Sequence, residues 1–196
     1  MKKFTGFTLI ELLITLAIVS ILLTIGVPSL KTFMQGNQLI ASTNELISAL
    51  HVARSEAIKL NTRVSICESS DGATCTETGS WENGWIAFVD GNGANPGDLV
   101  NTGSPCSASN TDCLLRVHGA IDDKLLNVAA ANVSSFTFTS RGLPKAANGA
   151  SQSGVFSLCS FDSSNNVVDS RAVILSFAGR VRVSDNQAVI SCPATP

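Results

Sequence analysis

The sequence lacks most of the residue patterns from which enzyme active sites are built. It has two histidines, His51 and His118, and neither lies in a nucleophile motif, so nothing in the sequence supports a Ser-His-Asp arrangement. The six cysteines are explained more simply as disulfide partners, which leaves no candidate nucleophile, and no phosphate-binding P-loop is present. We therefore expect a protein that is not an enzyme and needs no cofactor, with histidines that are solvated or locally hydrogen-bonded.

Metal sites are also poorly supported. No C-x-x-C occurs, and the histidines have no ligand-like spacing to the cysteines, which argues against zinc. Residues 90–98 are rich in side-chain oxygens, but Asn95 replaces the glycine of an EF-hand loop, and Asn101 stands where the bidentate glutamate would be. A turn between strands explains this stretch better than a calcium site.

Charge is scarce and unevenly placed. Charged residues make up 14% of the chain, and the net charge of −2 excludes a protein coated in basic residues. Residues 64–123 nevertheless contain nine acids and one base, whereas residues 139–196 contain five bases and three acids. Any affinity for a polyanion must therefore be local and lie toward the C-terminus.

The cysteines favour an oxidising compartment, because the chain begins with a membrane-targeting segment. Six cysteines allow 15 pairings. Their spacing suggests two local clips, Cys67 with Cys75 and Cys106 with Cys113, and a longer link between Cys159 and Cys192 that ties the last strands together.

The N-terminal segment has the length of a membrane span. Residues 7–27 are mostly apolar and carry one charge, Glu11, and at 1.5 Å per residue they match a bilayer core of about 30 Å. Lys2 and Lys3 would hold the preceding end in the cytoplasm. The alternative is a secretory signal peptide, but its apolar region would be shorter and would end in an A-x-A-like site. A carboxylate within a membrane is costly, which makes Glu11 a candidate for a functional partner.

This segment resembles a known leader. The residues Lys2, Lys3, Gly6, Phe7, Thr8, Leu9, Ile10, Glu11 and Leu12 are similar to the class III leader of type IV pilins and type II secretion pseudopilins. The resemblance implies cleavage after Gly6 by a prepilin peptidase, N-methylation of Phe7, and pairing of Glu11 with the N-terminal amine of a neighbouring pilin subunit. It implies a leader at 1–6, a transmembrane and assembly helix at 7–33, and a periplasmic domain at 34–196, anchored by a single pass in the inner membrane and surface-exposed once in a pilus.

The pattern after the span predicts a helix followed by a sheet. Apolar or small residues recur from Leu39 to Leu60 at alternating spacings of four and three, which marks one buried face of a helix. Pro28 and Gly36 mark expected bends. Short strands are expected at 63–67, 85–89, 114–117, 125–128, 135–139, 155–159, 171–177, 180–183 and 188–192, separated by turn-rich stretches. The expected class is α+β, with a long helix packed on antiparallel sheets.

Further features resemble the FimT/GspH group of minor pilins. They are Ala53, Arg54, Ser55, Glu56, Ala57 and Ile58 at the helix end, then Asn61 and Val64, then Trp81, Gly84, Trp85, Phe88 and Asp90, and finally Phe177, Gly179 and Arg180. The group includes both DNA-uptake pilins of the FimT type and type II secretion pseudopilin H, a structural component of a pseudopilus tip. Both functions stay open at this point.

The C-terminal run Gly179-Arg180-Val181-Arg182 is the candidate binding motif. A hairpin turn is expected at Ala178 and Gly179, after which Arg180 and Arg182 share one face of a strand, about 6.6 Å apart, in a spacing that suits phosphate oxygens. On spacing alone, two solvated arginines at a sheet edge explain the run better. Its resemblance to the G-R-x-R motif of FimT proteins implies contact with the DNA backbone, and Arg141 and Lys145 would extend the patch if folding brings them near. We therefore expect a minor pilin that binds extracellular DNA without sequence preference during natural transformation.

Overall fold

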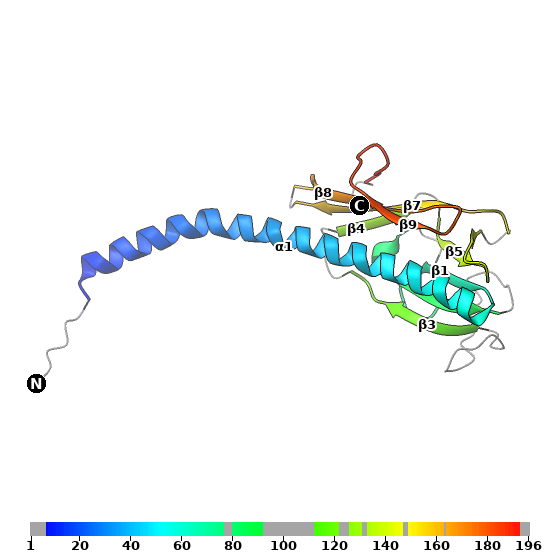
Figure 1. Cartoon of the computed structure of the whole chain (residues 1–196). Coiled ribbons are helices and arrows are strands. Elements are labelled where there is room, and N and C mark those ends of the chain that lie inside the picture. The colour runs from blue at the N-terminus through cyan, green and yellow to red at the C-terminus, as the bar shows by residue number, and fades with distance from the viewer. Residues whose placement is uncertain are drawn as a thin grey trace, which may run out of the picture. The chain divides into compact units, whose positions relative to one another are not determined.

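The computed structural model describes residues 7–76, 80–91, 112–121, 126–130, 133–146, 149–162 and 164–192. The chain forms two compact units, Met1–Asn37 and Gln38–Pro196. One long helix, α1 (Leu9–Leu60), runs through both, and every described strand belongs to the second unit (Figure 1). The predicted α+β class, with a helix ending at residue 60, is confirmed.

In the first unit, α1 presents an apolar surface. Every described large apolar side chain between residues 7 and 34 is exposed, and the segment is long and apolar enough to cross a membrane. Thr15, Ser20 and Thr24 each donate a hydroxyl hydrogen bond to a carbonyl three or four residues earlier, at 2.7–2.8 Å. Because these hydroxyl protons are used within the helix, the side chains can lie in lipid without an unsatisfied donor. The chain stays helical at Pro28 and Gly36.

The end of α1 is defined by its backbone. Asn61 adopts a left-handed conformation with φ of 51°. Its N–H bonds the carbonyl of Ile58, and the N–H of Thr62 bonds the carbonyl of Ala57. These two bonds form a Schellman motif, which satisfies the last helical carbonyls and turns the chain into the first strand.

The second unit contains two antiparallel sheets. The five-stranded sheet has the order β3-β2-β1-β5-β6, and its strands are β1 (Val64–Glu68), β2 (Trp85–Asp90), β3 (Asp112–His118), β5 (Ser135–Phe138) and β6 (Pro144–Lys145). The four-stranded sheet has the order β4-β7-β8-β9, and its strands are β4 (Leu126–Ala130), β7 (Gly154–Phe161), β8 (Val167–Leu175) and β9 (Val181–Ser184). A short 3-10 helix, η1 (Trp81–Asn83), precedes β2.

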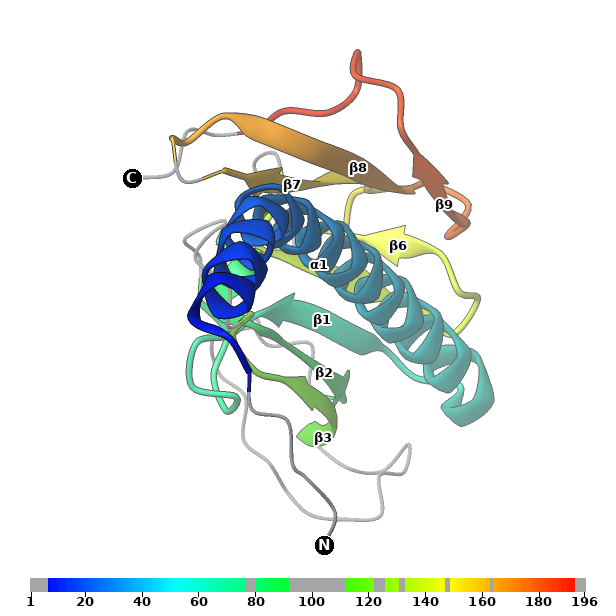
Figure 2. The same cartoon turned by 90° about the vertical axis from the view of Figure 1, so that its left-hand side faces the viewer.

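The core lies where the second half of α1 packs on these sheets (Figure 2). The predicted apolar face of the helix is confirmed, since Leu39, Leu46, Leu50, Ala53 and Ala57 are completely buried. These residues join apolar side chains of both sheets in one cluster. Burial of this face explains why the helix continues beyond its membrane-like segment: each turn removes apolar surface from water.

One strand expectation is wrong, and one short strand was not expected. The predicted strand at 188–192 is wrong, because the N–H of Val189 bonds the carbonyl of Asn186 in a turn, and the side chain of Asn186 accepts a second bond from the N–H of Ala188. This local Asn hydrogen bonding competes with strand pairing. The two-residue β6 was not predicted, since Pro144 within a short run argues against a strand.

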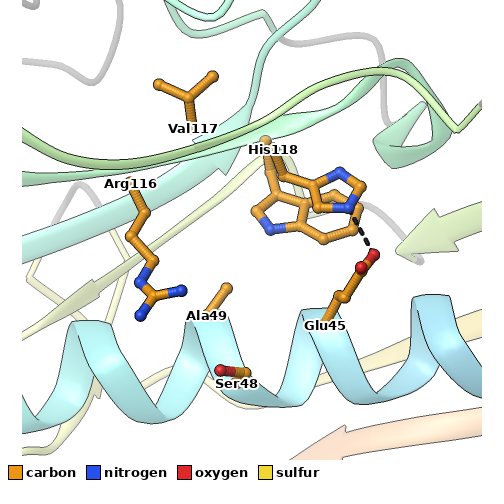
Figure 3. A pocket seen from close by; sticks show the side chains of 7 residues that line it. Glu45, Ser48, Ala49, Arg116, Val117 and His118 are labelled. Carbon is orange, nitrogen blue, oxygen red and sulfur yellow. Dashed lines mark hydrogen bonds and ion pairs between the residues drawn. The ribbon is translucent and has the colours of Figure 1, made fainter.

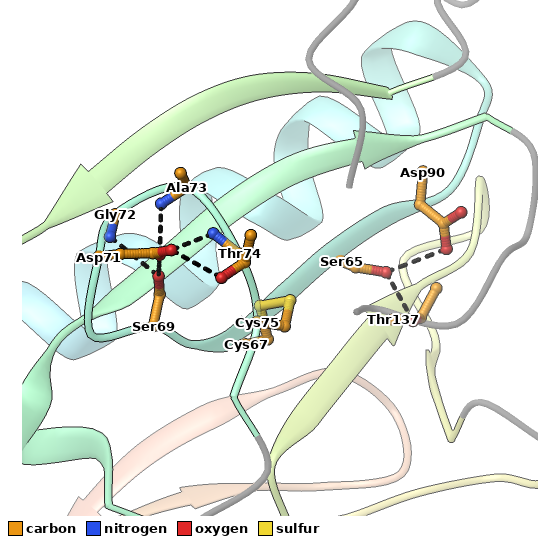
Figure 4. The surroundings of a disulfide bond; sticks show 10 residues. All are labelled: Ser65, Cys67, Ser69, Asp71, Gly72, Ala73, Thr74, Cys75, Asp90 and Thr137. Carbon is orange, nitrogen blue, oxygen red and sulfur yellow. Dashed lines mark hydrogen bonds between the residues drawn. A yellow bond between two sulfur atoms is a disulfide. The ribbon is translucent and has the colours of Figure 1, made fainter. Parts of the chain in front are cut away.

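The disulfide expectations hold where the structure describes them. Cys67 is bonded to Cys75, and Cys159 to Cys192. Cys106, the predicted partner of Cys113, lies outside the described residues. Inside the Cys67–Cys75 loop, Asp71 accepts hydrogen bonds from the N–H groups of Thr74 and Ala73, which hold the pKa of its carboxyl well below the ordinary value (Figure 4).

Candidate functional site

The predicted hairpin is present at the arginine motif. Strands β8 and β9 pair antiparallel, with Leu175 opposite Val181. The turn between them, residues 176–180, is closed by a bond from the N–H of Gly179 to the carbonyl of Ser176 and by one from the N–H of Ser176 to the carbonyl of Arg180. Gly179 has φ of +71°, a conformation that side chains disfavour.

A second turn lies directly against this hairpin. In residues 139–143, the N–H of Gly142 bonds the carbonyl of Thr139, and Gly142 has φ of +72°. A Cβ added at Gly179 would collide with the carbonyl oxygen of Gly142. The glycine at 179 is therefore required both by its own backbone conformation and by the neighbouring turn.

Arg54 of α1 joins the two turns. Its Nε donates to the carbonyl of Gly142 at 3.1 Å, and another guanidinium nitrogen donates to the carbonyl of Ala178 at 3.2 Å. Carbonyls 36 positions apart in sequence are thus held by one planar side chain from the helix. The rigid fork of arginine suits this double contact in a way that lysine does not.

Two of the predicted binding residues lie beside this junction, and a third lies further along β9. Arg141 immediately precedes Gly142, and Arg180 immediately follows Gly179, so the contact between the turns places both arginines beside it. Arg182 lies two residues further along, opposite Ile174 of β8. All three arginines are exposed, and none takes part in an ion pair within the described part of the chain. We call Arg141, Arg180 and Arg182 the arginine surface.

The predicted alternation along the strand is confirmed in part. Val181 is half-buried and packs against the core, whereas Arg180 and Arg182 are exposed; β9 begins at Val181, so Arg180 is the last residue of the turn and not part of the strand as predicted. Val183, however, is 45% exposed, because β9 is the outer strand of its sheet and the core does not extend beneath its far end.

Lys145 is less closely associated with this surface. It lies in β6 of the other sheet, is half-buried, and donates from Nζ to the hydroxyl of Ser151 at 3.1 Å. The opposite end of the β8–β9 pair has a different charge, since Asp169 and Asp185 line a shallow depression there with Arg171. Positive charge is therefore concentrated at the turn end of the pair.

His118 occupies a separate depression between α1 and β3 (Figure 3). Its ring stacks on Trp85 at 3.8 Å, its Nε2 lies 2.6 Å from a carboxylate oxygen of Glu45, and its Nδ1 contacts the carbonyl of Gly119. Both ring nitrogens are engaged, which confirms the expectation of a locally bonded histidine; His51 is exposed on α1.

Asp90, the first residue of the oxygen-rich stretch 90–98, has partners within the protein. Asp90 is buried at the end of β2, accepts a hydrogen bond from Ser65 at 3.1 Å, and lies 3.8 Å from the guanidinium of Arg63. Residues 92–100 and Asn101 lie outside the described residues. The carboxylate of Asp90 thus stabilises the strand end where the sequence raised the question of a cation.

The predicted assembly residues lie in the first unit. Phe7 is exposed, and the N–H of Glu11 donates to the hydroxyl of Thr8 at 3.4 Å, as in the first turn of a helix. Gly6 lies outside the described residues. Processing at Gly6 and pairing of Glu11 therefore stay predictions.

Comparison with known proteins identifies the family. The family model for type II transport protein GspH matches residues 42–179, more than half of the chain, and the model for the prokaryotic N-terminal methylation motif matches residues 1–27. The GspH match ends at Gly179, so Arg180 and Arg182 lie just beyond it. No curated protein matches the chain.

The fold is similar to that of a solved minor pilin. The type IV minor pilin FimU of Pseudomonas aeruginosa aligns in one crystal form with a TM-score of 0.50 and 23% identity, covering 78% of this chain and 92% of FimU. A second crystal form gives a TM-score of 0.48 at 23% identity, with coverages of 74% and 90%. Together with the two family matches, the long helix packed on antiparallel sheets shows that the chain belongs to the GspH family of type IV pilin-like proteins.

Proposed function

We propose that this protein is a minor type IV pilin that binds the DNA backbone through the arginine surface during DNA uptake. One observation carries the proposal: Arg54 bridges two turns whose contact places Arg141 and Arg180 beside one junction, with Arg182 two residues further along the chain. Exposed guanidiniums without carboxylate partners are suited to phosphate oxygens, which they contact in forked geometry.

Assembly into a filament supplies the rest of the function. The apolar half of α1 would lie in the inner membrane before assembly and against other pilin subunits afterwards, with the globular unit on the periplasmic side. Glu11 would then pair with the methylated amine of Phe7 in a neighbouring subunit, which lowers the cost of a carboxylate in an apolar surrounding. Prepilin peptidase is the processing partner in this proposal.

The expected affinity is low. Few cations contribute, and acids at the other end of the β8–β9 pair oppose a polyanion, so binding should not exceed the range of about 10⁻⁴–10⁻⁶ M typical of non-specific complexes. A filament that presents more than one such site to one DNA molecule would raise the effective affinity. Lys145, held on Ser151, should contribute less than the three arginines.

Charge-removing variants test the proposal. In fluorescence anisotropy with a labelled duplex, Arg180→Gln and Arg182→Gln should each weaken binding by the detergent-solubilised full-length chain, and the double variant should abolish it. Arg116→Gln is the matched control, since Arg116 is exposed on β3 of the other sheet. Thermal melts should coincide, because exposed charges contribute little to stability. Equal loss with Arg116→Gln, or no loss with the double variant, would contradict the assignment.

The second candidate is a type II secretion pseudopilin, and the match to the family of type II transport protein GspH favours it. That role proceeds through protein contacts alone and requires no affinity for DNA. Absence of binding by the wild-type chain at low salt would therefore select the secretion role.

A further inference from the structure

The C-terminal unit buries all but one of its phenylalanines. Phe88, Phe136, Phe138, Phe156 and Phe161 are at most 2% exposed, and both tryptophans are buried as well. Phe177, in contrast, is 60% exposed. The one exposed Phe or Trp side chain of this unit thus lies in the same turn that leads into Arg180 and Arg182.

The backbone around Phe177 is held in place. The turn is closed by the bond between Gly179 and Ser176, and the hydroxyl of Ser176 accepts a further bond from the N–H of Arg180. The carbonyl of Ala178, next to Phe177, is fixed by Arg54. An aromatic ring on a fixed turn loses little freedom on binding, which favours its use as a contact.

The surroundings of the ring combine apolar and cationic groups. Leu143 and Ile58 are partly exposed at the neighbouring turn, where Ile58 lies next to Gly142. The arginine surface adjoins the same junction. A wholly apolar partner would leave the arginines unpaired, whereas a strand of nucleic acid with accessible bases offers phosphates for the arginines and a flat ring for Phe177.

We propose that Phe177 stacks on an unpaired base, so that the arginine surface and Phe177 together form a binding site for single-stranded DNA. In a duplex the bases are already stacked, and Phe177 has no access to their faces, so only the arginines act there. This inference rests on the proposed DNA binding and adds a preference for single strands that the arginines alone do not supply. Because every base has an aromatic face, stacking adds affinity without sequence preference.

The experiment compares two probes with one set of variants. Anisotropy is measured with the detergent-solubilised full-length chain, using a labelled oligothymidylate and a duplex of the same length. Alanine substitution of a stacking residue weakens single-strand binding by about 5- to 150-fold per base. Phe177→Ala should cause a loss in this range for the single strand and leave the duplex affinity unchanged, whereas Phe177→Trp should retain single-strand affinity. Val117→Ala is the control, since Val117 is 53% exposed on β3.

The outcomes distinguish failure of the stacking inference from failure of the proposed DNA binding. If the wild type binds duplex and the Arg180, Arg182 double variant does not, while Phe177→Ala leaves single-strand binding intact, DNA binding stands and the stacking inference is wrong. Equal losses of affinity for the single strand and for the duplex would also overturn the stacking inference. If Phe177→Ala leaves the affinity for both probes unchanged but prevents incorporation into the filament, the ring contacts another subunit and the stacking inference is wrong. If the wild type binds neither probe at low salt, DNA binding itself fails and the stacking inference falls with it.

Discussion

The Nε of Arg54 donates a hydrogen bond at 3.1 Å to the carbonyl of Gly142, a residue 88 positions away in the sequence. Through the same guanidinium it also holds Ala178, so a helix residue fixes the spacing of the two turns that carry Arg141 and Arg180. Arg54 thus acts on the proposed site by positioning the two turns, while its own guanidinium is hydrogen-bonded to backbone carbonyls.

Replacement of Arg54 should therefore weaken DNA binding indirectly. Arg54→Lys keeps the charge but cannot bridge both carbonyls, so it should lower duplex affinity nearly as much as Arg54→Ala. The free energy of unfolding should fall by about 1–3 kcal/mol, because two carbonyls lose their donor. Lys59→Ala on the same helix is the control, since Lys59 pairs with Glu56. Wild-type affinity in Arg54→Lys would show that the bridge does not matter.

The disulfide between Cys159 and Cys192 should be the more stabilising of the two described. It links residues 33 apart, against 8 for Cys67 and Cys75, and the chain-entropy relation gives about 3.7 and about 2.5 kcal/mol. Loss of the longer link by double alanine substitution should lower Tm by about 7–15 °C. The shorter pair is a matched control, because Cys67 and Cys159 are both fully buried. A larger Tm loss from the shorter pair would contradict this ordering.

The half-buried Glu82 should make stability fall as pH rises. Burial raises the pKa of its carboxyl above the ordinary 4.5, and one carboxylate oxygen has no hydrogen-bond partner among the described residues. The folded state then binds more protons than the unfolded state at pH values between the unfolded and the folded pKa, so stability is lost as pH increases through that window.

The test is a comparison of Glu82→Gln with the wild type in thermal melts from pH 4.5 upward. The variant cannot ionise at this position, so its Tm should rise relative to the wild type as pH increases toward neutral. A difference in Tm that stays constant across the window would show that Glu82 titrates normally.

Processing of the N-terminus should follow the methylation motif. Intact-mass measurement of the membrane-extracted protein should show loss of residues 1–6 and one methyl group on Phe7. Glu11→Ala should still insert in the membrane, since it removes a charge from an apolar segment, but should fail to assemble. A chain that retains its leader, or that is cleaved near Ser29, would contradict the assignment.

The fold was largely predictable because its signals are local. Alternating spacings of four and three from Leu39 to Leu60 predict the buried helix face, and polar turns separate short apolar runs. The strand expected at 188–192 failed because the side chain of Asn186 caps a turn, a competition that residue pattern does not reveal. Local sequence signals also do not predict that β6 (Pro144–Lys145) pairs with β5.

The site was only half predictable. Strand alternation in the sequence predicts that Arg180 and Arg182 share one face; both are exposed, although Arg180 is the last residue of the turn and only Arg182 lies in β9. The role of Arg54 does not follow from the sequence, because it depends on two turns far apart in the chain meeting at the end of a helix. Gly142 and Gly179 both adopt positive φ, but nothing in the sequence indicates that they contact one another.

The salt dependence of DNA binding tests the central claim most directly. The detergent-solubilised full-length chain is titrated with duplexes of unrelated sequence between about 50 and about 200 mM salt. If the arginine surface contacts phosphates, log K should fall linearly with log salt, with a slope of about −2.7 for three contacts at about −0.9 each, and should be the same for every sequence. An affinity that does not change with salt would contradict contact with phosphates, and no binding at the lowest salt would leave a filament subunit that works through protein contacts alone.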